Sequence, residues 1–104
     1  IFQASGNEPF WSLKMDFNGN YHFNTLDGEE IFVPNVEGVK LAESEITQFY
    51  AEVEKATLII EIKSELCQDT MADKASNFSV YVQLKYSNEE QFRRFIGCGD
   101  FLEN

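Results

Sequence analysis

The stretch Phe78-Ser-Val-Tyr-Val-Gln-Leu-Lys-Tyr86 decides the fold class of this 104-residue chain. Its apolar residues occupy every second position, a pattern typical of a β-strand with one buried face. Residues 58–62 repeat the alternation. So do residues 11–17 and 21–25, which lie on either side of the turn Asn18-Gly-Asn20 and therefore predict a hairpin. Together these runs predict an all-β protein.

The remaining segments extend this series of strands. Residues 30–33 predict a short strand that ends at Pro34, because proline cannot donate to a ladder, and residues 36–41 are a weaker candidate. Residues 46–54 fit both a helical stripe and strand alternation, and we predict a strand because the following segment is β. We expect one domain, residues 1–104, folded as a small up-and-down antiparallel barrel of seven to eight strands, or failing that a sandwich.

Charge and residue types exclude several kinds of function. The formal net charge is −10, which repels phosphate backbones and anionic lipid surfaces, so we expect no nucleic-acid partner. The single histidine, His22, cannot build a three-histidine zinc site. Paired glutamates occur, but no calcium-binding loop frames them. We therefore expect no metal, no cofactor and no enzymatic activity.

Two cysteines, Cys67 and Cys98, bear on stability and on compartment. A bridge between them would close a loop of about 30 residues and add roughly 3–4 kcal/mol to a small domain. Inside a cell the same residues would more often be two free thiols. The chain starts at Ile1, which suggests an upstream signal peptide or lipoprotein leader, although a trimmed cytosolic chain would look the same.

The first candidate binding residues lie near the N-terminus, in the stretch Gly6-Asn-Glu-Pro-Phe-Trp11. Asn7 and Glu8 could present polar groups at a binding mouth, with Phe10 and Trp11 as its aromatic floor. The structural alternative is a turn fixed by glycine and proline, with Trp11 closing one end of the barrel as a core residue. Both roles can hold together.

Two further candidates lie late in the chain. The polar residues 68–77 predict a long loop, and Asp69 within it could hold the entry turn or face a ligand. Arg93 and Arg94 share one strand, so one of them should point inward or to the rim and pair with an acid, for which Glu8 or Asp69 is the expected partner. An inward arginine would indicate an anionic ligand, whereas the alternative is an arginine that extends from a barrel end into solvent. Of the two, we name Arg94 as the candidate ligand contact.

The N-terminal stretch, together with Cys67-Gln-Asp-Thr-Met71 and Gly97-Cys-Gly99, resembles a family of bacterial envelope lipoprotein domains that has no assigned reaction. This resemblance implies export to the periplasm or cell envelope, a Cys67–Cys98 disulfide and a small β-barrel. It is related in type to the barrel that inhibits c-type lysozyme and to META-type domains. The chain departs from the family pattern after Met71.

These observations lead to one expected function and two alternatives. We expect the soluble domain of an exported bacterial lipoprotein that binds a small ligand or an envelope protein at one barrel rim. That rim would be formed by the N-terminal turn and the 68–77 loop. Membrane contact would come only through an N-terminal anchor. The first alternative is inhibition of c-type lysozyme by an inserted loop, and a distant one is a metal-dependent or other enzyme.

Overall fold

The computed structural model describes residues 1–7, 9–69 and 74–102, with only the backbone described at Asp69 and Lys74. This part of the chain contains nine strands and no helix, so it has no helix that could cross a membrane. The all-β class is confirmed. The strands are β1 (Phe2–Asn7), β2 (Phe10–Met15), β3 (Asn20–Thr25), β4 (Glu30–Pro34), β5 (Val39–Lys40), β6 (Ile46–Val53), β7 (Ala56–Asp69), β8 (Lys74–Tyr86) and β9 (Arg93–Phe101).

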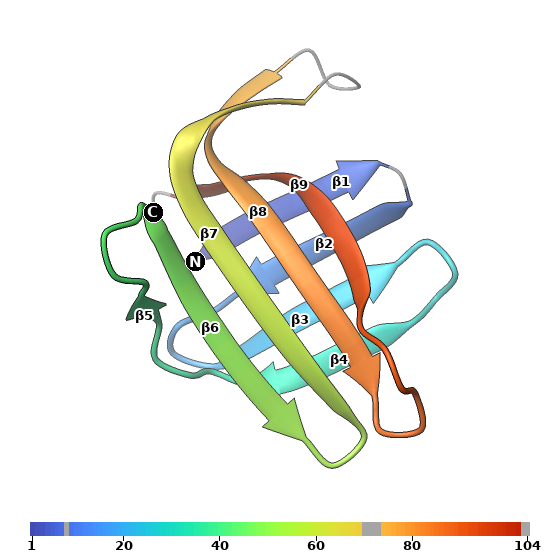
Figure 1. The fold of residues 1–104 in the computed structure, drawn as a ribbon. Coiled ribbons are helices and arrows are strands. Elements are labelled where there is room, and N and C mark those ends of the chain that lie inside the picture. Colours follow the sequence, from blue (N-terminus) through green and yellow to red (C-terminus); the bar gives the residue numbers. More distant parts are fainter. Residues whose placement is uncertain (8, 70–73, 103–104) are drawn as a thin grey trace.

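The nine strands form one antiparallel sheet made of two meanders. One meander is β1–β4 and the other is β5–β9, and pairing of β1 with β9 joins them into the order β4-β3-β2-β1-β9-β8-β7-β6-β5. The sheet curls into a half-barrel in which the two meanders cross over each other (Figure 1).

The predicted closed barrel of seven to eight strands is wrong in both count and closure. Among the described residues, no hydrogen-bonded pairing joins the outermost strands β4 and β5. Strand β5 has only two residues, and β4 ends at Pro34, which cannot extend a ladder. Pro34 therefore lies on an edge strand, as predicted.

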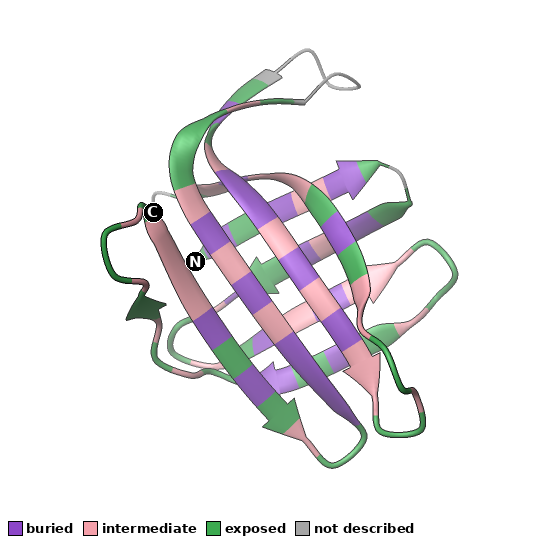
Figure 2. Ribbon diagram, in the orientation of Figure 1, coloured by how far each residue is buried: buried purple, intermediate pink, exposed green. Residues whose placement is uncertain are grey.

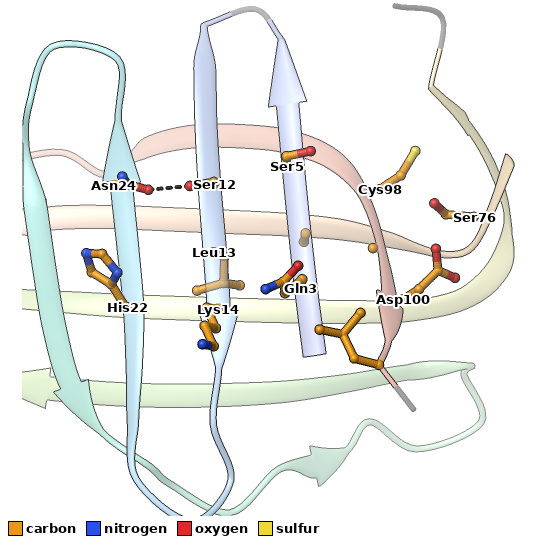
Figure 3. A pocket seen from close by; sticks show the side chains of 13 residues that line it. Gln3, Ser5, Ser12, Leu13, Lys14, His22, Asn24, Ser76, Cys98 and Asp100 are labelled. Carbon is orange, nitrogen blue, oxygen red and sulfur yellow. Dashed lines mark hydrogen bonds between the residues drawn. The ribbon is translucent and has the colours of Figure 1, made fainter. Parts of the chain in front are cut away.

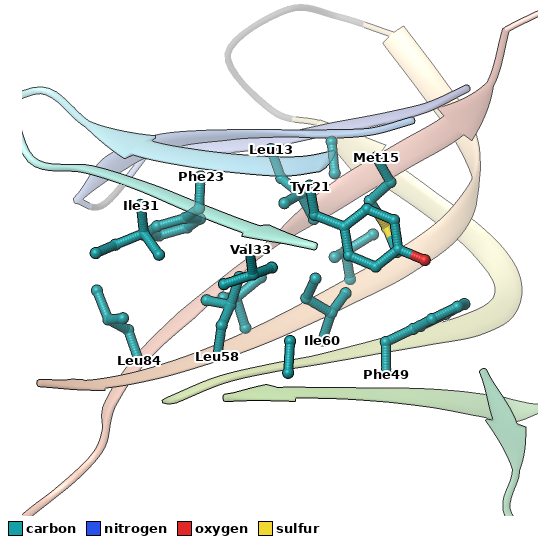
Figure 4. Close-up of a cluster of buried hydrophobic side chains, with 14 of the residues drawn as sticks. Leu13, Met15, Tyr21, Phe23, Ile31, Val33, Phe49, Leu58, Ile60 and Leu84 are labelled. Carbon is teal, nitrogen blue, oxygen red and sulfur yellow. The ribbon is translucent and has the colours of Figure 1, made fainter. Parts of the chain in front are cut away.

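Buried residues alternate with more exposed ones along the strands of both meanders (Figure 2). Trp11, Tyr21 and Phe23 of the first meander are fully buried, as are Leu58 and Ile60 of the second. Figure 4 shows side chains of the two layers meeting face to face. The alternation that predicted the strands thus also identifies the core. Several aromatic side chains nevertheless remain exposed, namely Phe10, Phe17, Phe32, Tyr50 and Phe101.

Two segments differ from the sequence prediction. Strand β1 was not predicted, because the small residues Ala4 and Gly6 on its buried face give only a weak apolar signal. The predicted 68–77 loop is also wrong. β7 continues to Asp69 and β8 begins at Lys74, so most of the segment is a paired ribbon. Residues 46–54 are strand rather than helix, as predicted, since β6 spans Ile46–Val53.

The ribbon of β7 and β8 is tied to β9 by a disulfide between Cys67 and Cys98. Because β8 lies between β7 and β9, the bridge joins strands that are not neighbours. The register of β7 against β8 shifts between Ser64 and Cys67, so β7 carries one extra residue there. Such a bulge bends a strand, and Figure 1 shows the ribbon turning away from the sheet beyond this point.

Candidate functional site: a pocket at one rim

A pocket of about 610 Å³ opens at the end of the half-barrel where the β1–β2 and β3–β4 connections meet the start of β9. Figure 1 shows the end of β1, the start of β2 and the β3–β4 connection on the same side of the molecule. The volume lies within the roughly 300–1,000 Å³ of small-molecule sites. We call this the rim pocket; it is lined by Asn7, Pro9, Phe10, Thr25, Leu26, Asp27, Glu29, Arg93, Arg94 and Phe95.

The β3–β4 turn forms one wall of the rim pocket and fixes Glu29. Backbone hydrogen bonds from Gly28 N to Thr25 O (3.1 Å) and from Thr25 N to Glu29 O (3.0 Å) close the turn. Gly28 adopts φ of 89°, a conformation that glycine reaches without steric cost. An Asp-Gly pair, here Asp27-Gly28, is a common sequence signal for such a turn. As a result, the Glu29 carboxylate points across the rim towards β9.

Arg93 meets that carboxylate with two hydrogen bonds. Its Nη1 donates to Glu29 Oε1 at 3.0 Å, and its Nη2 donates to Glu29 Oε2 at 2.9 Å. The guanidinium also lies over the Tyr86 ring, 5.4 Å from its centroid, and its Nε is 3.7 Å from Glu89 Oε2. A bidentate pair fixes both side chains more firmly than a single contact would. Arg93 is therefore a fixed part of the wall.

The ion pair also sets the protonation of its members. Hydrogen bonding from Arg93 lowers the pKa of Glu29 below its ordinary value, and hydrogen bonding to Glu29 raises the pKa of Arg93. Burial is the main cause that raises the pKa of Tyr86, and the nearby Glu29 charge adds to it. Both members of the pair thus remain charged at neutral pH.

Arg94 differs from its neighbour because strand alternation turns it outward. It is exposed, and it has no ion pair or hydrogen bond with any described residue. Apolar side chains lie beside it in the same pocket, including Phe10 (43% exposed) and Leu26 (78% exposed). The rim pocket therefore combines an available cation with exposed apolar surface.

Trp11 lies beneath this rim, in the core. Its side chain has no exposed surface, and its Nε1 donates to Ile96 O at 3.2 Å. Glycine is required at Gly6 and Gly97 because a Cβ at either position would overlap the indole ring and neighbouring backbone. The core role considered for Trp11 is confirmed, and its ring cannot touch a ligand in this conformation.

The structure brings together only some of the predicted site residues. Asn7 and Arg94 both line the rim pocket. Glu8 and the side chain of Asp69 lie outside the described part of the chain. Among the described residues, Arg93 pairs with Glu29, an acid that was not among the expected partners.

Glu29 and Leu26 were not predicted as parts of a binding site, whereas Phe10 was predicted in the aromatic floor and does line the rim pocket. Glu29 and Arg93 are 64 residues apart, and no local pattern links them. The available signal was the Asp27-Gly28 turn, which would have placed the following acid at a strand end. The rim prediction also named the 68–77 segment, yet no residue of that range lines the pocket among those that the structure describes.

No protein family, curated protein or solved structure matches the chain. Within the described ranges, no group of three or more His, Cys, Asp or Glu residues is placed to hold a metal ion. His22 hydrogen-bonds through Nε2 to Glu30 Oε1 at 2.9 Å on the outer face of the sheet.

Proposed function

We propose that this chain is a non-enzymatic binding domain that takes a small ligand with an apolar body and an anionic group into the rim pocket. The observation that carries the proposal is Arg94, whose guanidinium has no ion-pair or hydrogen-bond partner among the described residues and lies beside the exposed Phe10 and Leu26. Arginine is suited to carboxylate, sulfonate and phosphate groups because its donors form a planar fork. The Arg93–Glu29 pair supports the wall without competing for the anion.

The disulfide supports placement of this domain outside the cytoplasm. Bridges persist mainly in oxidising compartments, and Cys67 and Cys98 are joined in the fold. We propose export to the periplasm or cell envelope as the soluble part of a lipoprotein. The net charge of −10 makes nucleic acid an unfavourable partner.

A pair of related fluorescent probes tests the site. The probes are 8-anilinonaphthalene-1-sulfonate and its uncharged analogue N-phenyl-1-naphthylamine, titrated against the ¹⁵N-labelled protein. We expect the sulfonate to shift the backbone amides of Phe10, Leu26 and Arg94. Arg94→Gln should weaken sulfonate binding about tenfold, the equivalent of ~1.4 kcal/mol, and leave the uncharged probe unaffected. Arg94→Lys should retain part of the affinity.

Lys40→Gln is the matched control, because it removes one exposed cation from β5, outside the pocket. It should leave the affinity for both probes unchanged. Equal loss of sulfonate binding in Lys40→Gln and Arg94→Gln would mean that only net charge matters. Full affinity in Arg94→Gln would remove the basis of the proposal.

Inhibition of a c-type lysozyme is a second candidate function, supported by the β7–β8 ribbon. The ribbon projects beyond the rest of the sheet (Figure 1) and is clamped at its base by Cys67–Cys98. A rigidly mounted projection is the shape that cleft insertion requires. If this function is correct, the protein should inhibit lysis of cell walls by lysozyme, and reduction of the disulfide should weaken the inhibition.

A further inference from the structure

A second pocket, of about 500 Å³, lies on the outer face of the sheet, opposite to the core. It is formed over β1, β2 and β3 beside β9 (Figure 3). We call it the outer-face pocket. The side chains that carry the argument are Gln3, Ser5, Ser12, Lys14, His22 and Asn24. None of the residues that line it lines the rim pocket.

Strand register arranges these polar groups in two parallel rows. Ser5 lies opposite Ser12, which lies opposite Asn24. Gln3, Lys14 and His22 form the second row in the same way. Because paired strands are about 4.8 Å apart, each row offers a polar group at nearly regular intervals. Figure 3 shows both rows directed to the same side of the sheet.

The rows offer both donors and acceptors. Ser12 Oγ donates to Asn24 Oδ1, which orients the Asn24 amide and leaves its N–H groups available. The Ser5 hydroxyl and the Gln3 amide make no hydrogen bond with any described residue. Hydroxyl and amide groups act as donors and acceptors at once, so they match a ligand whose own groups do the same.

His22 supplies a fixed flat surface at one end of the second row. Its ring stacks on Phe32 with centroids 4.2 Å apart and planes within 3°, and Nε2 bonds to Glu30. Phe32 itself is 55% exposed. A ring held on two sides is preorganised, and the aromatic surface can cover the C–H face of a ligand that is polar elsewhere.

The charges around the pocket are balanced. Asp100 lies opposite Gln3 in the same row as Lys14, and Glu30 accompanies His22. An anionic ligand would therefore meet no excess of positive charge here, and the whole chain carries −10. We propose that the outer-face pocket binds a short neutral glycan, whose hydroxyl groups meet the two rows and whose ring packs against His22. This proposal does not rest on the function of the rim pocket.

Titration of the ¹⁵N-labelled protein with maltotriose and with triacetylchitotriose tests the site and separates hexose from amino-sugar glycans. At millimolar concentration, at least one of them should shift the backbone amides of Ser12, His22 and Asn24 in a saturable way. Asn24→Ala should lower that affinity about tenfold. Gln3→Ala should also lower it, and this exposed side chain can be removed without risk to the fold. Gln91→Ala, in an exposed turn, should leave the affinity unchanged.

Inorganic phosphate serves as the anionic comparison. Phosphate that shifts the same amides and displaces the glycan would overturn the proposal in favour of an anion site. The proposal is equally overturned if neither trisaccharide shifts these amides, or if the shifts map to Leu26 and Arg94 at the rim pocket. Full affinity in both Asn24→Ala and Gln3→Ala would also contradict it.

Discussion

Removal of the Cys67–Cys98 bridge should destabilise the domain by an amount that depends on the length of the loop that the bridge closes. The two cysteines are 31 residues apart in the sequence. The loop-entropy relation then gives ~3.7 kcal/mol at room temperature, as stabilisation lost when the unfolded chain is freed from the cross-link. Small domains have about 5–15 kcal/mol in total, so the loss is large. The variant Cys67→Ser with Cys98→Ser should therefore unfold at a much lower urea concentration.

Urea unfolding followed by tryptophan fluorescence measures this difference, because Trp11 is the sole tryptophan and is buried. The wild-type protein in reductant should match the double variant, which separates the bond from the effect of the serines. A difference below about 1 kcal/mol between the oxidised wild type and the variant would refute the reasoning. It would mean that the unfolded chain is already restrained without the bridge.

Two further outcomes follow from the core and from the rim. Trp11→Ala should lower the free energy of unfolding, measured in urea, by about 3–5 kcal/mol, because the whole indole is buried. Phe10→Ala on the same strand should lower it far less, because Phe10 is exposed. Equal losses in the two variants would contradict the assigned core. The lowered pKa of Glu29 means that its carboxylate stabilises the fold above the ordinary glutamate pKa, and this contribution is lost as pH falls through the folded pKa. The free energy of unfolding of the wild type and of Arg93→Gln should be measured from pH 7 to pH 3. The difference between the two should become smaller in acid. A difference that stays constant with pH would exclude the ion pair as its cause.

Alternation of apolar residues predicted most of the sheet, since burial of one face is a local property of sequence. The pattern in residues 78–86 marks β8 and that in residues 58–62 marks part of β7. β1 was not predicted because its buried face carries the small residues Ala4 and Gly6, where Trp11 and the backbone of β9 approach closely. The ribbon at the ends of β7 and β8 was not predicted because it has no hydrophobic face. Cross-strand hydrogen bonds and a disulfide hold it instead.

The site was less predictable than the fold because it depends on contacts between distant segments. Asn7 and Arg94 were predicted, and they do line one pocket. Glu29, the acid that meets Arg93, was not predicted, since only the folded sheet brings the β3–β4 turn to β9. The prediction that the barrel closes was wrong for a related reason. β5 has only two residues, and this length follows from packing rather than from the sequence pattern.

The pairing of β1 with β9 also sets how the molecule would respond to mechanical force. Phe2 lies opposite Phe101, and Leu102 N donates to Ile1 O at 2.8 Å. The start of β1 and the end of β9 therefore lie at the same end of their ladder. A force applied between residues 2 and 101 would therefore break the hydrogen bonds of this ladder one after another. Each bond contributes only about 0.5–1.5 kcal/mol to stability. The two meanders would part along this seam first, while the bridge from Cys98 to Cys67 keeps β9 fastened to its own half.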